Sequence, residues 1–474
     1  MTTTIPDYPL LISGEKVSTG QLLPVQDKFT GELYAHVHQA SKEDVSRAIQ
    51  EAKRAQATVP FGIPQRYEVL MKAAQIMRSR AEELADIMVA EAGKIKREAL
   101  FEVYWSADIF TESAEESRRL HGETFSLPVP GLDQKTCYTL RQPVGVVGAI
   151  TPFNFPLNLV AHKVAPALAG GNAVVLKPAE KTPVIAYKLC EILLEAGLPA
   201  GYLQYLGGEG ATVGEWMIAD PGIDYYSFTG SVKVGKRIKE ATGLRRVSLE
   251  LGSNSATIVH SDADPAAAAA ACSQGAFSNA GQVCISVQRI YVHETIYDRF
   301  LAELISQAEL LKVGDPRQED TGIGPMIAEK EAIRVQEWIE EAVQGGAVAH
   351  TGNKREGAHV WPTVLSNVSP EMKVVNSEVF GPVVSVTPYS TLDEAIDHVN
   401  RSDYGLQAGI LTNDLQAAMQ ASRRIRTGGV IVGGTSAFRI GCMPYGGVKN
   451  SGIGREGPRY AIEEMTDLKT VVLL

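Results

Sequence analysis

The sequence predicts an α/β protein built on two doubly wound, mostly parallel sheets. Apolar runs such as Val144–Ile150 and Asn172–Leu176 do not alternate with polar residues, which is typical of parallel strands buried on both faces. From Val144 onward such runs alternate with segments of helical periodicity, the pattern of βαβ units. A chain of 474 residues is too long for one ordinary core, so we expect two or three domains.

The first 120 residues are predicted to be mostly helical after a short β-like start. Apolar residues recur at three- and four-residue spacing over 42–55 and 66–92. Ser41 is a suitable N-cap for the first of these helices, and Gly93 is a suitable end for the second. A third helix is expected over 97–118, and its aromatic residues are interpreted mainly as packing residues.

The predicted elements of the α/β part fall into two sets, which predict two sheet domains with a cleft between them. The first set has strands at 144–150, 172–176, 202–205, 225–228 and 246–250, and helices at 183–196, 211–218 and 232–241. The second set has helices at 265–277, 296–311, 330–342 and 392–400, and strands at 287–292 and near Val384 and Ala408.

Two further segments are predicted to be exposed strands. Residues 134–142 alternate in polarity, and the apolar stretch 467–474 has strand-forming composition. Because an uncovered apolar strand promotes aggregation, we expect 467–474 to pair with another strand, which another subunit could supply.

Composition and charge argue against several classes of function. A net charge of −10 does not suit a nucleic-acid surface, and the absence of an 18-residue apolar run predicts no membrane span. Residues 1–7 lack the features of a signal peptide, which favours a cytoplasmic location. Five scattered cysteines and nine histidines without HExxH spacing predict a reduced protein without a metal site.

The stretch Phe277–Ser286 contains the main candidate for a nucleophile. Cys284 follows small and polar residues and precedes the apolar run 287–292. A turn followed by a strand would present its sulfur to a cleft. A single cysteine is more often a small buried hydrophobic residue, so its position alone does not establish a catalytic role.

Two polar motifs directly follow predicted strands, where ligands bind in open α/β sheets. In the loop Thr151–Pro156, two prolines stiffen the chain around Asn154, whose amide could help to bind an oxyanion. Lys177 and Glu180 suit the two hydroxyls of an adenine ribose, and the Glu180 carboxylate would disfavour a 2′-phosphate. Taken singly, Asn154 could instead satisfy loop backbone, and the charged pair could be an ordinary solvated one.

Two more motifs stand at the ends of the next strands. Gly230 and Ser231 lie where a strand passes into a helix and could bind a phosphate through free N–H groups, although no GxGxxG fingerprint is present. Glu250 ends the strand 246–250 and could act as a general base if its pKa is raised. A single carboxylate at such a position is more often structural.

In their order along the chain, these motifs resemble those of the aldehyde dehydrogenase superfamily over nearly the whole length. The set is Thr151–Pro156 (P-[WF]-N-F-P), Lys177–Glu180 (K-P-[AS]-E), Phe228–Ser231 (F-T-G-S), Glu250–Gly252 (E-L-G), Gly281–Cys284 (G-Q-x-C), Glu378–Pro382 (E-x-F-G-P), Pro444–Lys449 and Ser451–Glu456. No single motif decides the matter, but the ordered set is highly specific. The loops around Asn154 and Cys284 look most like the lactaldehyde and non-phosphorylating glyceraldehyde-3-phosphate dehydrogenase branch.

The resemblance implies a fold and an assembly. It implies Rossmann-like sheet domains: an NAD-binding domain over 1–120 and 141–252 and a catalytic domain over 253–455. It also implies a β oligomerisation arm over 121–140 and 456–474, and hence a homodimer or homotetramer.

The resemblance further implies a reaction with a small-molecule aldehyde. Cys284 would attack the carbonyl, Asn154 and the Cys284 backbone N–H would hold the oxyanion, and Glu250 would activate water to hydrolyse the thioester. The cofactor would be NAD, with NADP possible. Its contacts would be Thr151, Pro152, Phe153, Lys177, Glu180, Gly210, Gly230, Ser231, Leu251, Glu378 and Phe380.

Two departures from the family pattern bear on cofactor and substrate. Gly252 is followed by Ser253 and Asn254 where the family usually has Gly-Lys, which could alter cofactor placement. Some members of the branch carry an arginine in the entrance helix, where this chain has Trp105. Because tryptophan cannot pair with a phosphate, we expect a small neutral or hydroxylated, lactaldehyde-like aldehyde.

The expected substrate pocket leaves an alternative open. It comprises Trp105, Val283, Ile285 and Arg439. Arg439 could supply a positive charge, so an anionic aldehyde is the alternative: glyceraldehyde 3-phosphate, a sulfo- or phosphono-aldehyde, or succinic semialdehyde.

Other classes of function explain the motifs less well. A CoA-acylating aldehyde dehydrogenase would also use Cys284, but Glu250 favours hydrolysis. A thiol hydrolase could pair Cys284 with His260 or His293, but the cofactor motifs would then be unexplained. A non-enzymatic role conflicts with the retention of all presumed catalytic residues.

Overall fold

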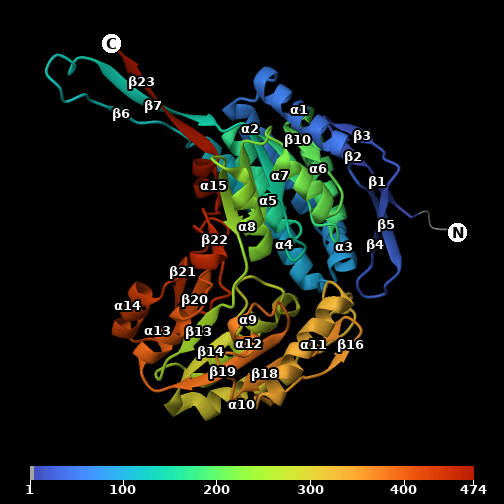
Figure 1. The fold of residues 1–474 in the computed structure, drawn as a ribbon, viewed down its shortest axis with the longest axis vertical. Helices are drawn as coiled ribbons and strands as arrows, with labels where there is room; N and C mark the ends of the chain where they lie inside the picture. Colours follow the sequence, from blue (N-terminus) through green and yellow to red (C-terminus); the bar gives the residue numbers. More distant parts are fainter. Residues whose placement is uncertain (1–4) are drawn as a thin grey trace.

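The computed structural model describes residues 5–474 and has two lobes, with a thin arm projecting from one of them (Figure 1). One lobe contains an eight-stranded sheet, and the other contains a seven-stranded sheet. The prediction of an α/β fold with two sheet domains and a small β arm is confirmed. Residues 1–4, which belong to the stretch considered for a signal peptide, lie outside the described part.

The eight-stranded sheet brings the ends of several motif-bearing strands together. Its strands, in spatial order, are β22 (Gly452–Ile453), β12 (Arg246–Glu250), β11 (Tyr225–Thr229), β8 (Val146–Ile150), β9 (Ala173–Lys177), β10 (Leu203–Tyr205), β2 (Leu10–Ile12) and β3 (Glu15–Val17). The five strands from β12 to β10 are parallel. Thr229 pairs with Glu250 and Ile150 with Lys177, so the loops that follow these strands start at one edge.

The helices of this lobe largely follow the predicted periodicity. They are α1 (Lys42–Thr58), α2 (Ile63–Ser79), α3 (Ala81–Ala92), α4 (Lys96–Ser117), α5 (Asn158–Gly170), α6 (Pro183–Glu195), α7 (Glu215–Ala219) and α8 (Val232–Thr242). Ser41 caps α1 as predicted. The single helix expected over 66–92 is divided at Arg80, which has non-helical backbone angles, and α3 ends at the left-handed Gly93. The helix expected over 211–218 is a π-type turn, Gly210–Gly214, followed by α7.

Helix α5 is absent from the sequence prediction. Every residue of α5 is buried, so its sequence shows no amphipathic period, and Pro166 lies inside it. It packs against α4 and against α15 (Pro458–Glu464). The burial of α5 matters for the site because it brings polar side chains of this helix into the interior.

The seven-stranded sheet carries the Cys284 loop. Its strands, in spatial order, are β15 (Val348–Ala349), β18 (Thr363–Ser366), β19 (Val383–Tyr389), β14 (Arg289–His293), β13 (Ala256–Val259), β20 (Gln407–Leu411) and β21 (Gly429–Val432). Its helices are α9 (Pro265–Phe277), α10 (Tyr297–Glu309), α11 (Glu329–Gln344), α12 (Lys373–Asn376), α13 (Leu392–Asn400) and α14 (Leu415–Arg424). The sequence predicted that Cys284 lies at the head of a strand. In the structure β14 begins only at Arg289, so Cys284 lies within a loop and the prediction is wrong on this point.

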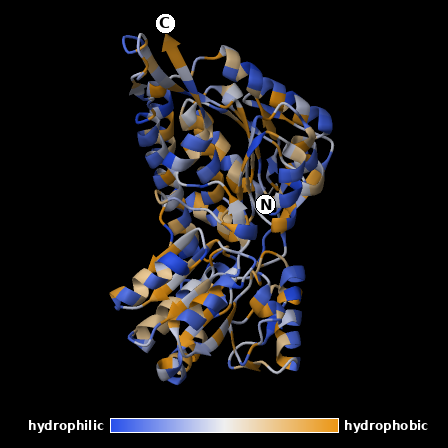
Figure 2. Ribbon diagram, turned by 60° about the vertical axis from the view of Figure 1, so that its left-hand side comes forward, coloured by the Kyte–Doolittle hydropathy of each residue, from blue (hydrophilic) through white to orange (hydrophobic). Residues whose placement is uncertain are grey.

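Two small sheets complete the lobes. They are formed by β1 (Asp7–Tyr8), β5 (Leu33–His38) and β4 (Leu22–Gln26), and by β16 (Arg355–Glu356) and β17 (His359–Val360). Figure 2 shows hydrophobic residues concentrated on strands of the interior, while most helices carry both hydrophilic and hydrophobic residues. No helix within residues 5–474 is long and apolar enough to cross a bilayer.

The arm consists of β6 (Thr124–Phe125), β7 (Thr136–Pro143) and β23 (Thr466–Leu473). β23 pairs antiparallel with β7 along its whole length, from Thr466 opposite Pro143 to Leu473 opposite Thr136. The terminal strand therefore finds its partner within the chain, and another subunit is not needed to supply one. Its outer edge still exposes apolar side chains such as Leu468 and Leu473.

Candidate active site

The Cys284 loop owes its shape to consecutive residues in the left-handed conformation. After α9 ends, Asn279, Ala280 and Gly281 have φ angles of 50°, 54° and 70°. A Cβ atom on Gly281 would lie 2.1 Å from the Gly381 carbonyl oxygen, so only glycine allows this approach. Such backbone angles are costly for residues other than glycine, and the surrounding contacts must hold them.

The Cys284 sulfur contacts a phenol, and a cation lies over the ring of that phenol. Cys284 Sγ is 2.9 Å from the Tyr445 hydroxyl, and the Arg439 guanidinium lies 3.6 Å from the centroid of the Tyr445 ring. Burial raises the pKa of Cys284 to about 11, while the Tyr445 hydrogen bond and the Arg439 charge act in the opposite direction. Cys284 is therefore mainly a thiol at neutral pH, and each further donor or cation near it favours the thiolate.

Glu250 is a buried carboxylate without a fixed partner. It ends β12, is 3% exposed, and neither of its carboxylate oxygens has a hydrogen-bond partner within the described chain. A Cβ atom on Gly446 would lie 2.8 Å from Glu250 Oε1, so Glu250 borders the segment that carries Tyr445. Burial and the charge of Glu456 raise the pKa of Glu250 well above its usual range, although Arg439 and Lys163 oppose this. A carboxyl group with these properties suits acid–base work.

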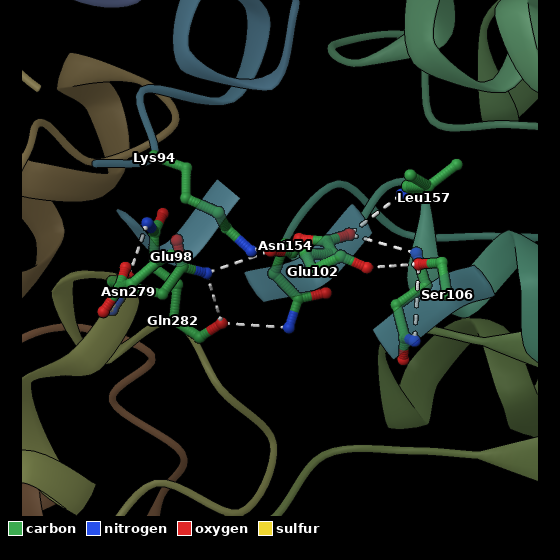
Figure 3. Close-up of polar contacts among 9 residues, drawn as sticks. Lys94, Glu98, Glu102, Ser106, Asn154, Leu157, Asn279 and Gln282 are labelled. Carbon is green, nitrogen blue, oxygen red and sulfur yellow. Dashed lines mark hydrogen bonds and ion pairs between the residues drawn. The ribbon is translucent and has the colours of Figure 1, made fainter. Parts of the chain in front are cut away.

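Asn154 joins the two lobes at this point. Its side chain is buried, and Nδ2 donates a hydrogen bond to the Gln282 carbonyl oxygen at 2.9 Å (Figure 3). The Nδ2 amide carries two hydrogens, so a second donor remains after this bond. The amide of Asn154 and the loop of Cys284 are thus adjacent, as the sequence predicted for an oxyanion site.

The residues expected to hold adenosine lie together after β9. Lys177 Nζ is 3.5 Å from Glu180 Oε2, and a Cβ atom on Gly210 would be 3.8 Å from Lys177 Nζ. Lys177 is almost fully buried, and burial lowers its pKa. Ser231 caps α8, where it accepts a hydrogen bond from the Val234 N–H, and Gly230 packs on the Phe228 ring. These groups fit a ribose and a phosphate.

The residues expected near the nicotinamide gather around Glu378. The Ser253 N–H donates to Glu378 Oε1 at 2.9 Å, and a Cβ atom on Gly252 would lie 2.3 Å from Glu378 Oε2. Burial raises the pKa of Glu378 to about 7, against the effects of the Ser253 N–H and Arg334. The rings of Phe153 and Phe380 meet edge to face with centroids 5.9 Å apart.

Three other predicted cofactor residues have different surroundings. The Thr151 hydroxyl is buried and has no hydrogen-bond partner among residues 5–474, so it is available to a bound ligand. Pro152 follows it in the same loop, between β8 and α5. The side chain of Leu251 packs against Gly235 of α8, so its contacts here are those of a core residue.

The two departures from the family pattern, Ser253 and Asn254, have structural roles. Ser253 donates its backbone N–H to Glu378, as described above. The Asn254 side chain donates to the Val375 carbonyl oxygen at 2.8 Å and accepts from the Ser402 hydroxyl at 2.6 Å. Through these two hydrogen bonds, the Asn254 side chain anchors the segment beside Glu378.

The predicted pocket residues surround Cys284 and Arg439. Val283 and Ile285 flank Cys284 and pack with Leu406 and Tyr445. The Arg439 guanidinium lies 5.8 Å from the centroid of the Trp105 ring.

Around Arg439 and Glu456, the structure adds residues that the sequence analysis missed. Arg439 Nη2 lies 2.9 Å from Glu456 Oε2 and 3.2 Å from His162 Nε2, and Lys163 Nζ lies 2.8 Å from Glu456 Oε1. Burial and Arg439 lower the pKa of His162 to about 3, so this imidazole is neutral. His162 and Lys163 lie on α5, which the sequence did not reveal. Glu456 belongs to a recognised motif but was assigned to the arm.

The histidines considered for a thiol hydrolase lie in a different cluster. His260 Nδ1 is 2.9 Å from the Tyr389 hydroxyl, and the His260 and His293 rings are in edge contact. Neither is hydrogen-bonded to Cys284 within the described residues. In this part of the chain, no group of His, Cys, Asp or Glu side chains is arranged to hold a metal ion.

Comparison with known proteins establishes the family. The Aldehyde dehydrogenase family profile matches residues 15–471. The chain belongs to the aldehyde dehydrogenase family. It is 53% identical to 3-sulfolactaldehyde dehydrogenases of Priestia aryabhattai and Priestia megaterium, over 99% of each chain. It is 37% identical to a lactaldehyde dehydrogenase of Methanococcus aeolicus, over 98% of this chain and 99% of the relative.

Solved structures of aldehyde dehydrogenases superpose closely on the fold. Aldehyde dehydrogenase 21 of Physcomitrella patens, in complex with the reaction product succinate, gives a TM-score of 0.96 at 38% identity and 99% coverage of both chains. GapN of Methanocaldococcus jannaschii, complexed with NADP, gives 0.92 at 37% identity, with 96% and 100% covered. A Bacillus cereus enzyme complexed with NAD+ gives 0.95 at 33%, with 98% and 96% covered. The chain is thus an NAD(P)-dependent aldehyde dehydrogenase.

Proposed function

We propose that this enzyme oxidises an anionic aldehyde, with 3-sulfolactaldehyde as the first candidate, to the corresponding carboxylate. Arg439 carries the proposal: its side chain is 6% exposed, and its Nε–H has no hydrogen-bond partner within residues 5–474. A buried donor without an acceptor is costly, and a ligand that supplies an acceptor recovers this cost. A sulfonate supplies three oxygens. The 53% identity to two 3-sulfolactaldehyde dehydrogenases supports this assignment.

The charges around Arg439 support an anionic substrate. Glu456 is a single carboxylate between two cations, Lys163 and Arg439. Burial opposes the ionisation of Glu456, but these two cations hold its pKa well below its usual range. The cluster therefore has a surplus of positive charge. The neutral substrate inferred from Trp105 is the weaker hypothesis, because the cation comes from a different segment and lies over the Trp105 ring.

In the proposed mechanism, the Cys284 thiol loses its proton to solvent, and the resulting thiolate attacks the aldehyde carbon. The Asn154 amide and the Cys284 backbone N–H hold the oxyanion that forms. A bound nicotinamide supplies the acceptor for the hydride that leaves this carbon. Ionised Glu250 then takes a proton from the water that attacks the Cys284 thioester, which releases the acid and restores the thiol.

The cofactor sites follow from the groups described above. We propose that Lys177 and Glu180 bind the adenine ribose beside Gly210, and that Gly230, Ser231 and the start of α8 bind a phosphate. Glu378 would bind the nicotinamide ribose. Thr151, Pro152, Phe153, Phe380 and the backbone of Leu251 would border the ring. We also keep the domain assignment and an arm-mediated dimer or tetramer as proposals, supported by the exposed apolar edge of β23.

A substrate pair tests the proposed function. The kcat/KM for 3-sulfolactaldehyde is expected to exceed that for lactaldehyde by about 10- to 100-fold, because a charged hydrogen bond contributes about 1.5–3 kcal/mol. Glyceraldehyde 3-phosphate and succinic semialdehyde extend the test to other anions. The measurement is initial-rate formation of the reduced nicotinamide.

The variant Arg439→Gln tests whether Arg439 causes this preference. In the variant, the ratio of kcat/KM for 3-sulfolactaldehyde to kcat/KM for lactaldehyde should fall towards one, mainly through a higher KM for the sulfonated aldehyde. Lactaldehyde is the internal control, because it reports any general damage to the site. A wild type that prefers lactaldehyde, or a variant that keeps the full preference, would contradict the assignment to Arg439.

Cofactor choice is expected to depend on Glu180. The wild type should prefer NAD+ over NADP+, and Glu180→Gln should lower the ratio of the two kcat/KM values by about tenfold, because like charges in contact cost binding energy. Glu180 is 44% exposed by side chain, so it can change without repacking the core. Equal specificity constants in the wild type would mean that Glu180 does not exclude a 2′-phosphate.

A further inference from the structure

One face of α4 holds both loops of the oxyanion site. Glu98 and Glu102 lie one helical turn apart (Figure 3). The Glu98 carboxylate accepts the Asn279 backbone N–H at 3.1 and 3.2 Å. Glu102 Oε1 accepts the backbone N–H groups of Leu157 and Asn158 at 2.9 and 3.0 Å. The helix thus fixes the Cys284 loop through one carboxylate and the Asn154 loop through the next.

The Asn279 side chain connects these two loops directly. Its Nδ2 donates to the Asn154 carbonyl oxygen at 3.0 Å and to the Gln282 carbonyl oxygen at 3.3 Å (Figure 3). The Asn154 side-chain amide donates to the same Gln282 oxygen at 2.9 Å. Asn279 therefore holds the backbone of the oxyanion donor and the carbonyl group that orients this donor.

The backbone of Asn279 is suited to this place. Its φ angle of 50° lies in the left-handed region, which asparagine tolerates better than most residues. Its N–H is held by Glu98, as described above, and its side chain by Asn154 and Gln282. Both halves of the residue are fixed, so the position of the Asn154 amide relative to Cys284 depends on it.

We propose that Asn279 is a positioning residue for oxyanion stabilisation: it orients the Asn154 amide towards the carbonyl oxygen of the group bound to Cys284. Asn279 acts through Asn154 and Gln282 and does not itself touch the reacting atoms. The inference rests on the proposed reaction at Cys284 and Asn154. It adds a residue whose loss should slow the chemistry while cofactor and aldehyde still bind.

The variant Asn279→Gly isolates this role. Glycine keeps the backbone N–H to Glu98 and adopts the same φ angle without strain, so only the bridging amide is lost. Asn367→Gly is a matched control: Asn367 has a φ angle of 52°, is exposed, and donates its side-chain amide to the Gly346 carbonyl oxygen. We expect kcat to fall about 10- to 100-fold in Asn279→Gly with little change in KM, because misplaced oxyanion donors lose this much. The control should retain wild-type kcat.

Two further readouts separate positioning from general disruption of the loop. Hydrolysis of 4-nitrophenyl acetate without cofactor should slow in Asn279→Gly, because ester attack by Cys284 also forms an oxyanion. Alkylation of Cys284 by iodoacetamide forms no oxyanion, so its rate should be unchanged. A fall in alkylation equal to the fall in ester hydrolysis would overturn the inference. The ester assay also works if no aldehyde is oxidised, so failure of the proposed function remains distinguishable.

A double variant completes the test. If Asn279 acts through Asn154, then Asn154→Ala combined with Asn279→Gly should be as slow in kcat as Asn154→Ala alone. Additive losses would overturn the inference, as would wild-type kcat in Asn279→Gly. Should the glycine variant fold poorly, Asn279→Asp tolerates the same backbone angles, lacks the amide donor, and should show the same loss of kcat.

Discussion

The variant Cys284→Ala is expected to lose aldehyde oxidation almost completely, by about 10⁴-fold or more, because removal of a covalent nucleophile has effects of this size. No neighbouring group can replace it. Tyr445 contacts the sulfur and Glu250 borders the segment that carries Tyr445, but a phenol and a carboxyl group with raised pKa values are poor substitutes for a thiolate. Cofactor binding should be retained, because the groups around Lys177 and Glu180 do not contact Cys284.

The measurement has two parts: initial-rate formation of reduced nicotinamide, and cofactor titration by tryptophan fluorescence or calorimetry. Cys442→Ala is the matched control, because Cys442 is also a free cysteine but is exposed. The control should oxidise aldehyde at the wild-type rate. Turnover by Cys284→Ala would remove Cys284 as the nucleophile, and loss of cofactor binding would leave its role in the chemistry unproven.

Local patterns in the sequence predicted much of the fold, because many elements carry their own signals. Helices 265–277 and 392–400 were predicted with the bounds that the structure has. β8 was predicted because its residues are all apolar, and the structure shows that all of them are buried. The same burial hid α5: a helix that is buried on every side has no amphipathic period to detect, and Pro166 lies inside it.

The candidate site was predicted in its parts, but its arrangement depends on contacts between distant segments. Cys284, Asn154 and Glu250 stood in motifs and could be named. Arg439 contacts Glu456 and His162, and Lys163 contacts Glu456, so this cluster joins three segments, one of them on the undetected α5. No local pattern reports such contacts, so the main expectation of a neutral substrate was inferred from Trp105, and the charge of Arg439 supported only the alternative of an anionic one. For the same reason, the links from α4 to the two oxyanion loops became visible only in the structure.

The second large effect is expected for Glu250→Gln, which should lower steady-state kcat by about 10³-fold, within the range found for loss of a general base. Glutamine keeps the shape of the side chain but cannot take a proton from water. Attack by Cys284 and loss of the hydride do not require that base, so the first turnover should proceed. A rapid-mixing experiment should therefore show a burst of reduced nicotinamide, about one per active site, followed by a slow phase.

The pH dependence of kcat provides an independent check on Glu250. Burial and Glu456 raise the pKa of Glu250 well above its usual range, so Glu250 is protonated at low pH and gains its basic form as pH rises through that pKa. Thioester hydrolysis in the wild type should accordingly accelerate with rising pH. In Glu250→Gln this rise should be absent from the slow phase, because the titrating group has been removed.

The burst distinguishes between the two roles that the position of Glu250 allows. Glu250 borders Gly446, next to Tyr445 whose hydroxyl contacts the Cys284 sulfur, and the charge of Glu250 contributes to the raised pKa of Cys284. If Glu250 served mainly to deprotonate the thiol, Glu250→Gln would lose the burst together with the steady state. If it serves as the base for hydrolysis, the burst remains and only the later phase slows. A substitution of the exposed Glu68 by Gln should change neither phase, and a wild-type steady state in Glu250→Gln would assign the base to another group.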